Sequence, residues 1–155
     1  MIDLPADFHD MLVELSCADA EFVVVGGYAV AFHGSPRATK DLDIFVRATP
    51  MNAARVYRAL AAFGAPVRAF EVTEADFETY DGVLQIGVAP LRIDVLNRIK
   101  AVTFDEAVAE GCSFDLDGHR IPVIGLSALL ANKTAVAREQ DLADVAALTA
   151  TDRSK

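Results

Sequence analysis

The feature that most constrains this chain is a short apolar run that ends in two glycines and is soon followed by a strand headed by two acids. Residues 22–25 (FVVV) are bulky β-formers and predict a short buried strand. Gly26 and Gly27 break the run, and residues 28–33 predict a short helix. Residues 41–46 (DLDIFV) alternate as a second strand. The fold must therefore accommodate two carboxylates at the start of an otherwise apolar strand.

The rest of the pattern mixes helices and strands. Asp117-Gly118 is a strong two-residue hairpin signal, and the pattern between residues 66 and 81 fits an edge strand followed by a short acidic helix. Further elements are expected as helices over 5–18, 50–63, 104–110 and 126–148, the last broken near Arg138, and as strands over 83–88, 91–96, 113–116 and 119–124. This order predicts an α+β (mixed α/β) fold in one domain over residues 1–155, with a frayed tail at 150–155.

Composition narrows the class of protein. A chain of 155 residues that is 53% apolar has enough material for one sizeable core. The longest uncharged apolar run, residues 22–32, is too short to cross a bilayer, and the N-terminal MIDLPADFHD does not resemble a signal peptide. We therefore expect a cytoplasmic protein.

Charge and cysteine content exclude further classes. The net charge of −9 makes nonspecific binding to nucleic acid unfavourable, although a local basic patch could still hold a nucleotide or an RNA end. Cys17 and Cys112 are isolated, so no zinc knuckle or disulfide scaffold is expected. The P-loop and protein-kinase motifs are also absent from the sequence.

Asp41 and Asp43 point to the same face of the second strand, about 7 Å apart, because side chains alternate along a strand. Two partly buried carboxylates are costly without a partner, and a magnesium ion would supply one. The alternative is a solvent-exposed strand start. Asp94 in LRIDVLN is a third acid among apolar strand residues. If its strand lies beside residues 41–46, the three carboxylates converge and suit metal-assisted phosphoryl transfer.

The loop before these acids offers groups that suit a phosphate. Backbone amides at a helix start favour an anion, and Gly26-Gly27 would let it approach closely, although a tight turn with positive φ explains the pair equally well. Arg37 and Lys40 follow in the same loop, either as phosphate partners or as solvated residues.

Together these residues resemble the polymerase-β-type nucleotidyltransferase superfamily. The resemblance rests on Gly-Gly at 26–27, Asp-Leu-Asp at 41–43 and the later strand acid Asp94. The pairs His33-Gly34 and Arg37-x-Thr39 extend it to a branch of small nucleotidyltransferases related to abortive-infection and toxin–antitoxin proteins. The C-terminal segment is similar to a helical Lys…Arg…Asp-x-x-Asp element of that branch, here Lys133, Arg138, Asp141 and Asp144.

The resemblance implies a small mixed β-sheet with helices mainly on one side, and a set of site residues. Asp41, Asp43 and Asp94 would be the catalytic, metal-binding acids, with Asp94 assisting deprotonation of the acceptor hydroxyl. The nucleotide would be held by Gly26, Gly27, Arg37, Lys40 and Lys133. Thr39, Arg138 and Asp141 would support the site from outside it; Arg138 and Asp141 could instead lie on a solvated helix face, or Asp141 could pair with Arg138 or Arg37.

The implied reaction moves a nucleoside monophosphate from an NTP such as ATP, with Mg²⁺ or Mn²⁺, to a hydroxyl of a protein, RNA or small molecule. The implied setting is a toxin–antitoxin system with a protein partner or an oligomer. The alternative is a noncatalytic nucleotide- or partner-binding module on the same fold.

Overall fold

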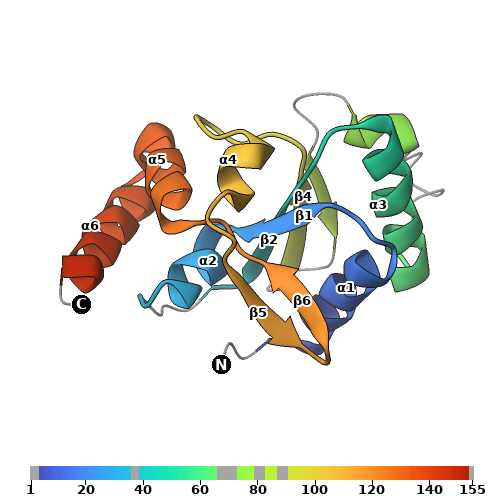
Figure 1. Ribbon diagram of the computed structural model, residues 1–155, viewed down its shortest axis with the longest axis horizontal. Coiled ribbons are helices and arrows are strands. Elements are labelled where there is room, and N and C mark those ends of the chain that lie inside the picture. The colour runs from blue at the N-terminus through green and yellow to red at the C-terminus, as the bar shows by residue number, and fades with distance from the viewer. Residues whose placement is uncertain (1–3, 36–38, 66–72, 79–82, 87–90, 154–155) are drawn as a thin grey trace.

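The computed structural model describes residues 4–35, 39–65, 73–78, 83–86 and 91–153 (Figure 1). Its helices are α1 (Ala6–Cys17), α2 (Gly26–Phe32), α3 (Pro50–Phe63), α4 (Phe104–Val108), α5 (Leu126–Val136) and α6 (Glu139–Arg153), with a 3-10 helix η1 (Glu74–Phe77). Its strands are β1 (Phe22–Val25), β2 (Asp41–Val46), β3 (Val83–Ile86), β4 (Arg92–Leu96), β5 (Ser113–Leu116) and β6 (His119–Pro122).

Four strands form one mixed sheet in the order β1-β2-β4-β3. β1 runs antiparallel to β2 and β3 runs antiparallel to β4, whereas β2 and β4 are parallel. A parallel pair needs a long crossover connection, and α3 lies within it. The hairpin β5–β6 forms a separate ladder that touches β1 through a bridge between Val24 and Val123. The predicted α+β class is confirmed.

Four of the helices, α1, α3, α5 and α6, form two pairs beside this sheet. Figure 1 shows α1 and α3 beside each other at one end of the view and α5 and α6 at the other, with the sheet between them. The apolar residues Phe8, Met11, Leu12 and Leu15 recur at helical spacing along α1 and are all buried. α3 is capped at its start by Thr49, whose side chain accepts a hydrogen bond from the Asn52 amide, and at its end by the left-handed Gly64. Among the described residues, no helix has the length and apolarity to span a membrane.

The structure changes some of the expected element boundaries and confirms others. α2 begins at Gly26 itself, so the glycines start the helix and do not precede it. α6 continues to Arg153, so residues 150–153 are helical where fraying was expected. The break near Arg138 is confirmed, because Ala137 adopts φ 58° between α5 and α6. The edge strand expected after residue 66 lies mostly outside the described residues.

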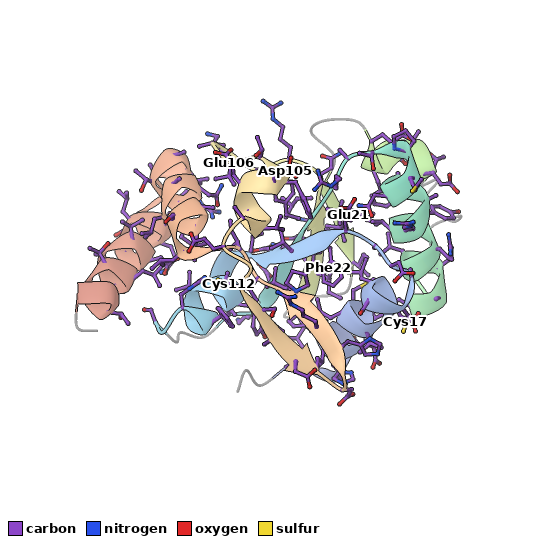
Figure 2. All side chains as sticks on the ribbon, in the orientation of Figure 1. Cys17, Glu21, Phe22, Asp105, Glu106 and Cys112 are labelled. Carbon is purple, nitrogen blue, oxygen red and sulfur yellow. The ribbon has the colours of Figure 1, made fainter. Side chains whose placement is uncertain are left out.

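Both cysteines carry free thiols, as expected. Figure 2 shows Cys17 at the end of α1 and Cys112 near the base of β5, in separate parts of the molecule. Glu21 and Asp105, also labelled there, both pair with Arg47, whose guanidinium stacks on the Phe104 ring 4.5 Å from its centroid. These contacts hold α4 against the C-terminal end of β2, whereas Asp41 and Asp43 lie at its N-terminal end.

Candidate active site

The three aspartates lie on neighbouring strands in the centre of the sheet. The parallel register pairs Asp43 on β2 with Asp94 on β4. Two residues earlier on each strand, and on the same face of the sheet, Asp41 pairs with Arg92. Burial alternates along β4, so Ile93 and Val95 enter the core while Arg92 and Asp94 face the other side. The sequence expectation that the strand of Asp94 lies beside β2 is therefore correct.

The acids are crowded and poorly solvated. Burial raises the pKa of the Asp43 carboxyl to about 7, and the negative charge of Asp94 adds to the rise, while Lys133 opposes it. Burial also raises the pKa of Asp94, against the lowering effect of Arg92. The Asp94 Oδ1 atom is buried and makes no hydrogen bond in the described structure. Ionised carboxylates in this cluster therefore require positive charge nearby.

Arg92 provides the nearest cation. Its Nη2 donates a hydrogen bond to the Asp41 Oδ2 over 3.2 Å, and its Nε lies 3.4 Å from the Asp94 Oδ1. Neither Nε nor that oxygen has a hydrogen bond, so the second contact is an ion pair without good hydrogen-bond geometry. Arg92 and Asp94 are two positions apart in one strand and so share a face, which was the signal by which the sequence could have identified Arg92 as a site residue.

Gly26 lies directly against Asp43. An added Cβ at Gly26 would stand 2.9 Å from the Asp43 Cγ and 3.1 Å from its Cβ, and the residue has φ +68°. Glycine is needed here because the turn is left-handed and because the carboxylate occupies the space of a side chain. Of the two explanations for the glycine pair, the structure supports the positive-φ turn for Gly26 and adds the contact with the acid.

The C-terminal helices contribute a second buried ionic group. The Lys133 Nζ on α5 lies 3.0 Å from Asp141 Oδ1 and 3.0 Å from Asp144 Oδ2 on α6, and all three side chains are at most 5% exposed. Arg138 also pairs with Asp141 at 2.7 Å, while its own side chain is largely exposed. Burial works to raise the pKa of Asp141, but the hydrogen bonds from Arg138 and Lys133 lower it to about 2.

These pairs decide between the alternatives for the C-terminal motif. Asp141 and Asp144 are buried, so the interpretation as a solvated helix face is wrong, and Asp141 forms the ion pair with Arg138 that was the structural alternative. Arg37, the other expected partner, lies outside the described residues. Lys133 is already engaged by two carboxylates, so its expected contact with a triphosphate stays a prediction.

A pocket of about 760 Å³ lies over the acids and is bounded by β2, β4, the start of α2, and both C-terminal helices. It includes Gly26, Gly27, Thr39 and all three aspartates of the sheet. Six of the chain's 14 basic residues line it: Lys40, Arg92, Arg98, Lys100, Lys133 and Arg138. Although the protein as a whole is acidic, a large share of its basic residues lines this one pocket, and this favours the binding of an anionic ligand.

Comparison with known proteins identifies the family of this chain. A family model described as "Nucleotidyl transferase of unknown function (DUF2204)" matches residues 6–154. The chain belongs to this family. No curated protein matches the sequence. The crystal structure of JHP933 from Helicobacter pylori is similar at a TM-score of 0.44 and 14% identity, over 90% of this chain and 61% of that one. The chain thus spans less than two thirds of that protein's length.

The residues of this DUF2204 protein suit a divalent cation. Carboxylate oxygens are the ligands that Mg²⁺ prefers. Burial raises the pKa of Asp43, and the Asp94 Oδ1 atom accepts no hydrogen bond. Within the described residues, however, no three Asp, Glu, His or Cys side chains are arranged as a ready metal site. The expected convergence of three carboxylates is therefore incomplete, because Asp41 and Asp94 are both turned toward Arg92.

Sequence reasoning missed part of the pocket of this DUF2204 member. Arg98, Lys100 and Asn132 line it although no motif contains them. Arg98 and Lys100 follow β4 directly, where the chain leaves the sheet. The only sequence signal was their position just after the strand of Asp94, since polar groups that follow a strand lie at the edge of its sheet.

Replacing Gly26 with alanine is expected to destabilise this protein more than the same change at Gly111. Gly111 has φ +67°, nearly the value of Gly26, but nothing lies within 4 Å of an added Cβ there. Gly111→Ala should therefore cost about 1 kcal/mol of left-handed strain, and Gly26→Ala about 1–3 kcal/mol more from the displaced Asp43 carboxylate. Urea unfolding of both variants measures the difference. Equal losses would show that Asp43 does not constrain this position.

Proposed function

We propose that this protein transfers a nucleoside monophosphate from an NTP to a hydroxyl group of an acceptor, with divalent metal ions held by Asp41, Asp43 and Asp94. The observation that carries the proposal is the parallel pairing of Asp43 with Asp94 beneath a pocket lined by six basic residues. Acids that attract a metal and bases that attract phosphates are both needed for this reaction, and both occur here in one hollow.

In this proposal the acidic residues bind metal and accept a proton, and the basic residue and backbone amides bind phosphate. A bound divalent ion would lower the pKa of the attacking hydroxyl and stabilise charge on the leaving pyrophosphate. Asp94 is the candidate to assist removal of the hydroxyl proton, since its pKa is raised by burial and one of its oxygens has no hydrogen bond. Lys40, which is exposed at the pocket edge, and the amides of Gly26 and Gly27 are the candidates to hold phosphates.

The C-terminal helices have a supporting role in this proposal. Lys133 is fixed between Asp141 and Asp144, yet its positive charge opposes the raised pKa of Asp43. It thus favours the ionised form of Asp43, which is the form that a metal ion needs. Thr39 donates a hydrogen bond to the Asp41 carbonyl over 3.3 Å and so helps to fix the start of β2.

We also propose a class of acceptor molecule and a biological role. The motif resemblance favours a role in a toxin–antitoxin system, in which the acceptor is an RNA or a partner protein. The net charge of −9 supports a protein acceptor over a long RNA, because the surface outside the pocket repels phosphate backbones.

Thermal stability in the presence of each NTP tests the proposal. We expect one NTP to raise the melting temperature with Mg²⁺ or Mn²⁺ and to have no effect with EDTA. Ligand at a hundredfold excess over its Kd adds about 2.7 kcal/mol to the apparent stability of the native state. If no NTP produces a metal-dependent shift, the donor-site assignment is wrong for the isolated chain, and a partner-binding module becomes the better interpretation.

A further inference from the structure

Arg92 links two of the acids to which the proposed function assigns a metal. Its guanidinium lies between Asp41 on β2 and Asp94 on β4, at 3.2 Å and 3.4 Å. The two carboxylates therefore share one positive charge that comes from the chain itself. This position is the one that a cation has to reach in order to contact oxygens of both strands.

The hold of Arg92 on these acids is weak. Its side chain is 42% exposed, and its buried Nε makes no hydrogen bond. Lys133 offers the contrast, because its ammonium is only 5% exposed and lies 3.0 Å from each of two carboxylates. A partly exposed pair with imperfect geometry contributes little stability, whereas a buried pair resists separation. Of these two cations, Arg92 is the one that can leave its partners.

We propose that Arg92 is a displaceable internal counter-ion, which neutralises Asp41 and Asp94 in the metal-free protein and moves toward the phosphates of the bound nucleotide when metal ions enter. This inference rests on the proposed function. The guanidinium and a divalent ion compete for the same oxygens and repel each other at short range. Once released, the guanidinium stays within the basic pocket, where a bidentate contact with a phosphate is available to it.

This exchange makes metal and nucleotide binding cooperative. Without nucleotide, a metal ion has to displace Arg92, which lowers the affinity for the ion. With nucleotide, the released guanidinium gains a phosphate partner and the cost is offset. Arg92 is thus a positioning residue that ties occupation of the acids to the presence of the donor substrate.

The test measures Mn²⁺ affinity of the full chain by electron paramagnetic resonance, first without nucleotide. Arg92→Met removes the charge and keeps much of the side-chain volume. We expect it to bind Mn²⁺ about tenfold more tightly than the wild type. Lys100→Met is the control, because it removes one charge from the same pocket without a described contact to either acid. Its effect should remain within about threefold, as for a screened charge at a distance.

The second arm measures NTP affinity at saturating Mn²⁺. We expect Arg92→Met to bind the nucleotide about tenfold more weakly, so that metal affinity rises while nucleotide affinity falls. A residue that only stabilised the strand pair would not move these two affinities in opposite directions. If Arg92→Met does not fold, Arg92→Lys replaces it, with a smaller change of the same signs.

The outcomes separate this inference from the proposed function. If the wild type binds Mn²⁺ through Asp43, but neither Arg92 variant binds it more tightly than Lys100→Met does, then Arg92 is no counter-ion and the proposed function stands. If the wild type and Asp43→Asn bind Mn²⁺ equally weakly with and without NTP, the metal site itself is wrong and both proposals fall.

Discussion

Asp43→Asn is expected to abolish metal-dependent NTP binding, with a loss of at least about a hundredfold in affinity for the metal–nucleotide complex. Asparagine keeps the size of the side chain but lacks the charge that a hard cation requires. Asp43 is central to the cluster, since it pairs in register with Asp94 and touches the glycine at the start of α2. Calorimetric titration with Mg-NTP measures the loss. Asp115→Asn, which changes an exposed acid on β5, should bind like the wild type.

The same substitution should stabilise the metal-free protein at high pH. The pKa of Asp43 is about 7 in the native state against an ordinary value of 3.8, so the native state holds the proton over a window in which the unfolded chain has lost it. The free energy of unfolding of the wild type therefore falls as pH rises from about 4 to 7. The asparagine side chain of Asp43→Asn does not titrate, so this variant should gain on the order of 2–4 kcal/mol over the wild type at pH 8 and almost nothing at pH 4.

Urea unfolding in EDTA at several pH values measures this gain. Asp115→Asn, with its exposed side chain, should show no such dependence. A difference between Asp43→Asn and the wild type that stays constant from pH 4 to pH 8 would mean that Asp43 is well solvated in the native state. In that case the crowding of the acids could not be an argument for a metal.

Lys133→Met should strongly destabilise the packing of the C-terminal helices. Methionine fills the space but leaves Asp141 and Asp144 buried without the ammonium that lies 3.0 Å from each. Removal of one partner from a buried ion pair costs about 3–5 kcal/mol. Lys40→Met removes the same charge from an exposed position and should change stability by less than about 0.5 kcal/mol.

A double variant distinguishes lost pairing from lost packing. Asp144→Asn in the Lys133→Met background removes one of the stranded charges, so part of the lost stability should return. The measurement is the urea midpoint of each variant at pH 7. If Lys133→Met folds with wild-type stability and loses only nucleotide affinity, the resemblance-based role as a triphosphate contact is right, and the buried pairs contribute little.

The fold was predictable where the local pattern is strong. β2 and α3 have the expected bounds of residues 41–46 and 50–63, because the alternation of side chains along a strand and the capping of a helix, here by Thr49, are local properties. The start of α2 was misplaced, since glycine is a poor helix former and only the contact with Asp43 shows why Gly26 is there. The length of α6 was underestimated because chain ends usually fray, whereas this helix continues to Arg153.

The site was predictable in its acids and less so in its bases. Asp41, Asp43 and Asp94 stand out because a charged residue in an apolar strand is costly. Arg92 escaped notice as a site residue, since its alternation with Ile93 is equally typical of a solvated strand face. The burial of Lys133, Asp141 and Asp144 could not be read from spacing alone, because a charged helix face looks the same in sequence whether water or another helix covers it.

The parallel pairing of β2 with β4 has a consequence for how chains of this kind can change over generations. Residues can be gained or lost outside the paired strands, for example between β2 and α3, without moving Asp94, because the register is set by the strands themselves. Inside β4 a single inserted residue would turn Asp94 into the core and Ile93 or Val95 into the pocket. Changes in chain length are therefore tolerated outside the paired strands, but an insertion or deletion within β4 would displace Asp94 from the site.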